Sequence, residues 1–263
     1  MSNNIVASVT RAGRYEPFNL QVARGQIMGH SIVSIFGYQT NITSTTAPQN
    51  SSIPVWENAV AYVYPTTAST MSVASSSATD AGAQVLINGL DANFSIISET
   101  VTLTSGTVTT VNSYFRINGL LLTKAASGQK TNVGTITVKQ SSNIVAQISI
   151  GIGKSQAAIY TVPAGYEFYL DQVEVNTDNG YGGSAMYYNV LSTNNNTGVT
   201  FDVLQQAFTS IFSVDRNNNP FYYAPKSDIQ WQIATNNSSA VQVGVIVTGK
   251  LIQANNNVTG VGT

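Results

Sequence analysis

The sequence predicts an all-β protein: an antiparallel β-sandwich or jelly roll of one or two sandwich units, preceded by an extended N-terminal arm. Apolar residues recur at every second position in one segment after another, which is the spacing of strands with one buried face. The segments are separated by turns rich in Asn, Ser, Thr and Gly, as in antiparallel sandwiches. No segment has the spacing of a long amphipathic helix.

The clearest strands lie near the C-terminus. In DIQWQIAT (228–235), Trp231 shares one face with two isoleucines while glutamines occupy the other face. In AVQVGVIVTGKLI (240–252), valines alternate with polar or small residues. The intervening NNSS (236–239) is typical of a turn, so we predict that the two strands form a hairpin. Because Trp231 is in register with isoleucines, we expect it in the core and not on an exposed sugar-binding platform.

Similar alternation predicts the remaining strands. We place them at residues 32–38, 57–63, 69–74, 84–90, 95–103, 107–117, 133–139, 144–150, 157–162, 166–175, 185–192 and 199–214. The pattern is interrupted near residue 150 by Gly-Ile-Gly. We therefore divide the chain into an arm (1–30), a first sandwich unit (31–150), a second sandwich or jelly-roll unit (151–254) and a flexible tail (255–263).

The predicted arm has apolar and aromatic residues in no regular period and a notable share of the positive charge. An extended arm can lie along a neighbouring subunit, and the alternative is that it packs on its own domain. Its candidate residues for intersubunit contact are Arg11, Arg14, Tyr15, Phe18 and Arg24.

The composition argues against most catalytic and nucleic-acid-binding functions. Charged residues make up 9% of the chain, with 11 Lys and Arg against 12 Asp and Glu, whereas an ordinary globular domain has about 25% charged residues. No basic stripe is present, so we expect no nucleic-acid partner. There is no cysteine and one histidine, His30, so we expect no metal, no cofactor and no thiol chemistry. We also expect no membrane segment and synthesis in the cytoplasm, because no apolar run is long enough for a membrane span or signal peptide.

The segment GIGKS (151–155) ends like a nucleotide-binding P-loop, but Ile148 stands where the first glycine of that motif belongs. The segment is followed by AIYTVPAGY, a strand and a turn, where a P-loop needs a helix. We predict a linker between two β units. DRNNNP (215–220) similarly resembles the start of a calcium loop, but Pro220 occupies the required glycine position, which favours a surface turn.

Catalysis finds little support. His30 has no partner motif, so we expect a structural histidine. Asp171 and Glu174 are an odd number of positions apart on one predicted strand, which puts them on opposite faces. We predict that the protein is not an enzyme. The alternative is a hydrolase that uses a pair of carboxylates which only the fold brings together.

The chain resembles a family of small virion structural proteins of tailed bacteriophages, especially cyanophages, over roughly residues 22–170. The motifs that carry this resemblance are VARGQIMGH (22–30), FG (36–37), YP (64–65), SSSATD (75–80), GLDANFSIISETVTL (89–103), SYFRI (113–117), NVGTI (132–136) and IYTVPAGY (159–166).

The resemblance implies a virion protein without catalytic activity. The function it implies first is a head decoration or cement protein, typically a β-rich homotrimer on the outer capsid surface whose partner is the major capsid protein. The alternative is a tail, baseplate or fibre component that binds host surface glycans through exposed aromatic residues. Both kinds of protein use β-sandwiches, so the fold does not decide between them.

Overall fold

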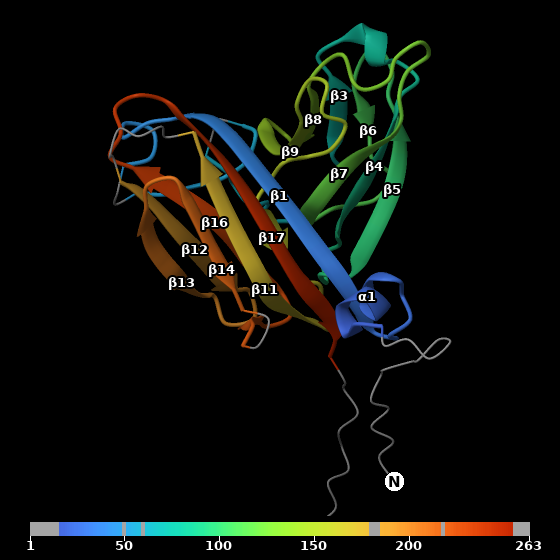
Figure 1. The fold of residues 1–263 in the computed structure, drawn as a ribbon. Helices are drawn as coiled ribbons and strands as arrows, with labels where there is room; N and C mark the ends of the chain where they lie inside the picture. Colours follow the sequence, from blue (N-terminus) through green and yellow to red (C-terminus); the bar gives the residue numbers. More distant parts are fainter. Residues whose placement is uncertain (1–15, 49–50, 59–60, 179–184, 217–218, 255–263) are drawn as a thin grey trace, which may run out of the picture.

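The computed structural model describes residues 16–48, 51–58, 61–178, 185–216 and 219–254, and these are nearly all β, with every strand pair antiparallel (Figure 1). The predicted all-β, antiparallel sandwich class is confirmed. Within the described ranges, no helix has the length and apolar character needed to cross a membrane.

The large unit is a sandwich of two five-stranded sheets. Its first sheet has the order β1 (His30–Ile42), β17 (Val241–Gln253), β11 (Tyr166–Thr177) and β14 (Ile211–Asp215), with β15 (Phe221–Tyr223) also on β11. Its second sheet has the order β10 (Ile159–Thr161), β16 (Ser227–Thr235), β12 (Met186–Asn194) and β13 (Val199–Phe208), with β2 (Ile53–Pro54) also on β16.

The small unit pairs two further sheets around a core of its own. One sheet has the order β6 (Val108–Thr109), β3 (Ser72–Ser75), β8 (Ile136–Gln140) and β9 (Asn143–Ile148). The other has the order β5 (Ile96–Thr102), β4 (Gln84–Leu90) and β7 (Arg116–Lys124). A single 3₁₀ turn, η1 (Ala78–Asp80), follows β3.

Alternation along the strands builds both cores. In β17 the valines at 241, 243, 245 and 247 are buried, and Gln242 and Ile246 between them are exposed. Trp231 of β16 is fully buried among them, as predicted. The core of the small unit contains side chains from both of its sheets, including Val85 and Ile136.

The grouping of strands differs from the predicted division at residue 150. Although β1 and β2 precede the small unit in sequence, β1 pairs with β17 and β2 pairs with β16. The reason is that β1 and β17 are neighbours in one antiparallel ladder, which runs from His30 opposite Ile252 to Ile42 opposite Val241. Their buried side chains lie on the same face of the sheet. The first and last strands of the large unit therefore lie side by side (Figure 1).

The predicted hairpin of residues 228–252 is wrong. β16 and β17 belong to opposite sheets of the large unit, and their apolar faces pack on the same core from two sides. Residues 236–240 cross between the sheets, where Asn237 O accepts a hydrogen bond from Ser44 N at 2.6 Å. Alternation was read correctly in both strands, but it does not identify the neighbour of a strand.

Three predicted strands also differ. Among the described residues of 57–63 there is no strand, and the preceding residue, Trp56, forms an isolated bridge with Ala157. The segment 107–117 turns after β6 because Glu99 Oε2 accepts hydrogen bonds from the N–H groups of Val111 and Asn112. The segment 199–214 is divided into β13 and β14, which lie in different sheets.

The described part of the predicted arm is not extended. It contains a short helix, α1 (Phe18–Ala23), which begins after Pro17, whose carbonyl accepts hydrogen bonds from Leu20 N and Gln21 N. The helix buries Gln21 and Val22. It ends at Ala23, and Gly25, two positions later, has a φ of 68° in the left-handed region that glycine readily adopts.

Two motifs of the sequence meet at Asp80, at the end of SSSATD. Its carboxylate accepts hydrogen bonds from Val133 N at 2.7 Å and Gly134 N at 2.9 Å, both in NVGTI, and from Ser75 Oγ at 2.6 Å. Gly134 is required here because a Cβ would lie 2.4 Å from Ser77 N. Burial opposes ionisation of Asp80, but these hydrogen bonds outweigh it and lower its pKa below the ordinary 3.8.

Asp80→Asn should lower the free energy of unfolding by about 1 to 3 kcal/mol at neutral pH, because an amide replaces an acceptor of backbone N–H groups. A lowered carboxyl pKa stabilises the folded state above the ordinary pKa, and that contribution is lost as the pH falls through the folded value. The difference between the variant and the wild type in urea unfolding should therefore shrink below pH 3.8. Asp202→Asn, at an exposed position, is the control; an equal effect there would contradict the assignment.

Candidate functional site

The predicted contact residues fall partly outside the described structure. Arg11, Arg14 and Tyr15 lie outside the described residues. Phe18 is 39% exposed, and its ring contacts the ring of His30 edge to face at 5.9 Å between centroids. Arg24 Nη1 donates to Glu16 Oε1 at 2.5 Å, so this positive charge is paired inside its own segment.

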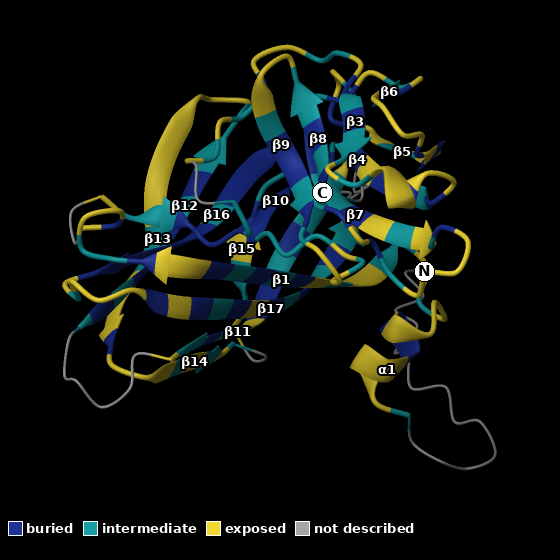
Figure 2. Ribbon diagram, turned by 90° about the horizontal axis from the view of Figure 1, so that it is seen from above, coloured by how far each residue is buried: buried dark blue, intermediate teal, exposed yellow. Residues whose placement is uncertain are grey.

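Exposed apolar side chains gather where α1 meets the start of β1. Phe18 and Leu20 of α1 are 39% and 48% exposed, Met28 is 94% exposed, and Ile32 of β1 is 38% exposed. Figure 2 shows most of α1 exposed beside the strand. We call Phe18, Leu20, Met28 and Ile32 the apolar end of the molecule. An exposed group of this kind is typical of a contact surface.

The segment GIGKS connects the two units, as predicted. Gly151 and Gly153 have φ of 77° and 72°, and Gly153 O accepts a hydrogen bond from Leu122 N at 2.8 Å. The next described element is β10, a strand, where a phosphate-binding loop would lead into a helix. Lys154 is exposed, and its backbone bridges Leu121 of β7.

Lys154→Ala should leave stability within about 0.5 kcal/mol of the wild type, because its side chain is exposed and its backbone bridge does not depend on the side chain. Thermal unfolding and size-exclusion chromatography measure this. Loss of assembly, or ATP binding that disappears with the substitution, would show that the lysine side chain has a role of its own.

The other titratable candidates are held in structural contacts. His30 Nδ1 lies 3.0 Å from Met28 O. Asp171 ion-pairs with Lys250 at 2.5 Å, and Glu174 accepts a hydrogen bond from Asn176 Nδ2 at 2.9 Å. Over the part of the chain that the structure describes, no three His, Cys, Asp or Glu side chains gather as a metal site would require.

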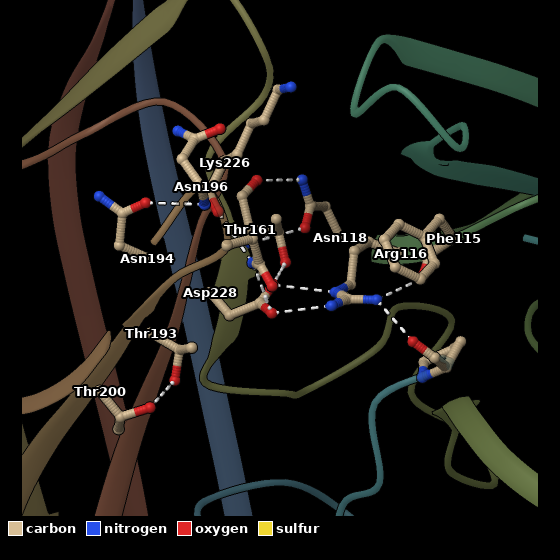
Figure 3. A network of polar contacts seen from close by, with 12 residues as sticks. Phe115, Arg116, Asn118, Thr161, Thr193, Asn194, Asn196, Thr200, Lys226 and Asp228 are labelled. Atoms are coloured by element: carbon tan, nitrogen blue, oxygen red, sulfur yellow. Dashed lines mark hydrogen bonds and ion pairs between the residues drawn. The ribbon is translucent and has the colours of Figure 1, made fainter. Parts of the chain in front are cut away.

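The most elaborate polar site is a buried junction between the two units (Figure 3). Arg116 of β7 donates from Nε and Nη2 to the two oxygens of Asp228 of β16, both at 2.9 Å. The side chains are 5% and 4% exposed. Asp228 also accepts from Thr161 Oγ1 at 2.6 Å and Asn195 Nδ2 at 2.9 Å. This bidentate pair, one partner from each unit, joins the two cores.

The third guanidinium nitrogen of Arg116 also donates hydrogen bonds, and aromatic rings lie close to the guanidinium group. Arg116 Nη1 donates to Pro65 O at 2.8 Å and Phe115 O at 2.9 Å. Its Cζ lies 4.1 Å from the ring centroid of Phe115 and 4.7 Å from that of Tyr64, the geometry of cation–π contacts. Burial raises the pKa of Tyr64, so this hydroxyl is neutral beside the pair.

Motifs far apart in the sequence converge on this junction, which the sequence analysis missed. Its members from the quoted motifs are Tyr64 and Pro65 (YP), Phe94 (GLDANF), Phe115 and Arg116 (SYFRI) and Thr161 (IYTVPAGY). The signal that could have revealed the junction is Asp228, a charged residue at the start of the apolar strand DIQWQIAT. In a chain with so few charges, a charged residue beside buried positions indicates a paired, buried charge. Because Arg116 and Asp228 are both fully engaged, the junction is suited to holding the units together and not to binding a substrate.

The comparisons with known proteins assign no family. No protein-family model and no curated protein matches the sequence. Similar solved structures include the MCP of Sulfolobus turreted icosahedral virus, at 10% identity over 88% of this chain and 99% of that chain, with a TM-score of 0.26. The infectious bursal disease virus VP2 subviral particle matches at 10% identity over 87% of this chain and 73% of that one, with a TM-score of 0.22.

A third match is a bacterial enzyme. The CBM22-1 and GH10 modules of a Clostridium thermocellum xylanase match at 10% identity over 76% of this chain, with a TM-score of 0.23. This chain spans 30% of the length of that one. TM-scores this low carry no argument about the fold or the function of this chain.

Proposed function

We propose that the chain is a structural protein of a bacteriophage virion and not an enzyme. Its function would be to decorate or cement the outer capsid, where it bridges neighbouring major capsid proteins. The observation that supports this best is the convergence of the family-resemblance motifs on the buried junction of Arg116 and Asp228. Those motifs serve to fix two sandwiches to each other, which suits a rigid bridging body.

The apolar end supplies a surface by which such a body would bind the shell or a second copy of itself. A protein that binds the assembled shell but not its separated subunits stabilises the shell by mass action. Burial of Phe18, Leu20, Met28 and Ile32 on a partner would provide the apolar anchors that stable interfaces need. A homotrimer on the capsid surface is the arrangement that the family resemblance implies.

Cryo-electron microscopy of purified particles, together with copy-number measurement, tests the proposal. A cement protein should approach the major capsid protein in abundance and give density on the outer shell. A few copies located only at the tail would overturn the capsid assignment and favour the tail, baseplate or fibre alternative.

The double substitution Phe18→Ser and Leu20→Ser should weaken capsid binding at least about tenfold, because it removes exposed apolar anchors without opening the core. Co-sedimentation with capsids that lack the protein measures the loss, and deletion of residues 1–24 should have at least the same effect. Val111→Ser, at a 90% exposed position of the small unit, is the matched control. If the double-substituted protein and the deleted protein both occupy capsids as fully as the wild type, the apolar end is not part of the capsid interface.

A further inference from the structure

A polar groove lies on the outer face of the second sheet of the large unit, away from the junction and the apolar end. Its volume is about 560 Å³, and its lining comes from β12, β13, β16 and Ser52. Tyr187 and Asn189 of β12 point into it, since they alternate with Met186, Tyr188 and Val190, which are buried in the core. A volume of this size is in the range of about 300 to 1,000 Å³ that small-molecule sites occupy.

One end of the groove is built around the aromatic ring of Tyr187. Its cross-strand neighbours are Ala207 on β13 and Ala234 on β16. Because both neighbours carry only a methyl group, no large side chain on either side competes for the face of the ring. Asn236 Nδ2 donates to the Tyr187 hydroxyl at 3.0 Å, which fixes the ring in place. The result is a partly exposed and positioned aromatic surface.

The next row across the sheet consists of amide side chains. Asn189 lies between Gln205 of β13 and Gln232 of β16. Gln205 Nε2 donates to Asp202 at 3.0 Å, and Gln232 accepts from Ser52 Oγ at 2.6 Å, so the two glutamines are held in place. Within the described structure, Asn189 Oδ1 is buried without a hydrogen-bond partner. An unpaired buried acceptor is costly, and a donor from a ligand would satisfy it.

The charge of the lining narrows the class of ligand. Among the described residues that line the groove, Asp202 is the one charged residue, and none is Lys or Arg. Phosphate groups and nucleic acids are therefore disfavoured. The polar lining equally disfavours a wholly apolar ligand. An aromatic face beside fixed hydrogen-bonding groups suits a molecule with one face of C–H groups and an edge of hydroxyl groups.

We infer that this groove binds a neutral saccharide unit, stacked on Tyr187 and hydrogen-bonded to Asn189, with the Asp202 carboxylate accepting hydrogen bonds from its hydroxyl groups at the rim. This inference does not depend on whether the protein belongs to the head or the tail of a particle. It goes beyond the proposed structural function, because a bridging protein needs no such groove.

The test uses the full chain and a panel of methyl glycosides of neutral hexoses and N-acetylhexosamines at millimolar concentrations. Two-dimensional NMR should show saturable shifts that include the backbone amides of residues 187–189 and 202–207. Tyr187→Ala should weaken binding at least about tenfold, and Asn189→Ala should weaken it severalfold. Tyr187→Phe keeps the ring and should keep most of the affinity. Tyr222→Ala removes a tyrosine that is 52% exposed on the opposite sheet and should change nothing.

The outcomes that contradict the inference are distinct. If no glycoside in the panel shifts these amides, or if Tyr187→Ala and Tyr222→Ala alter binding equally, the groove is not a saccharide site. Binding of only anionic sugars, or of peptides with no glycoside binding, would also overturn it. Because particle location is measured separately, a failure here leaves the capsid proposal to its own test.

Discussion

Arg116→Ala is expected to lower the free energy of unfolding by about 3 to 5 kcal/mol. The substitution leaves the Asp228 carboxylate 4% exposed and without its cationic partner, and an uncompensated buried charge is strongly destabilising. It also removes donors from the carbonyl groups of Pro65 and Phe115 and the cation that packs on the Tyr64 ring. Denaturant unfolding followed by the fluorescence of buried Trp231 measures the loss.

The paired substitution distinguishes a stranded charge from a general loss of packing. Arg116→Met combined with Asp228→Leu replaces the ion pair with apolar side chains, and it should recover a large part of the stability lost in either single variant. Arg24→Ala is the control, since its pair with Glu16 is 47% exposed on the arginine side and is worth no more than about 1 kcal/mol. A loss after Arg116→Ala no larger than this control would mean that the junction does not hold the units together.

The stability of the protein is expected to fall as the pH rises from 4.5 towards 8, because of Glu57. Burial raises the pKa of this carboxyl from 4.5 to about 8, although the backbone N–H groups of Glu57 and Gln156 act in the opposite direction. Its Oε2 accepts a hydrogen bond from Gln156 N at 2.7 Å, and in the described part of the chain its Oε1 is buried without a partner. The folded state therefore holds a proton that the unfolded state has released, and stability declines through that window.

Glu57→Gln should remove most of this pH dependence. A neutral amide has no charge to desolvate, so at pH 8 the variant should be more stable than the wild type by on the order of 4 kcal/mol, since a tenfold change in proton affinity is worth about 1.4 kcal/mol. Below pH 4.5 the two proteins should be nearly equal. Thermal unfolding at a series of pH values measures both limits, with Glu174→Gln as the control. A stability that rises with pH through the same window in the wild type, but not in Glu57→Gln, would contradict the assignment.

The strands themselves were largely predictable because their signal is local. The predicted strand at 84–90 coincides with β4, and 228–235 differs from β16 by a single residue. The partners of the strands were not predictable in the same way. Residues 228–252 have the sequence of a hairpin, yet their two strands lie in opposite sheets. Alternation shows which face of a strand is buried, but not which strand lies beside it.

The junction could not be derived from the sequence for a related reason. Arg116 and Asp228 are 112 positions apart, and the basic residue nearest to Asp228 in the sequence is Lys226, not Arg116. The predicted arm failed at Phe18–Ala23 because the first turn of a short helix depends on the Pro17 carbonyl and on burial of Val22. The burial of Val22 is a tertiary contact, and a helix of six residues is too short to give a periodic pattern of apolar residues.

The small unit is inserted into the chain of the large unit, which is the parent sandwich. Ala158 N donates to Val55 O at 2.8 Å, so the points where the chain leaves and re-enters the large unit are in direct contact. Among the described residues from 56 to 157, none belongs to the buried core cluster of the large unit. A short turn in place of residues 57–156 would therefore leave the parent core complete. Such a turn would also remove Arg116 and leave Asp228 buried without its cationic partner, so a chain shortened in this way would need an apolar residue at that position.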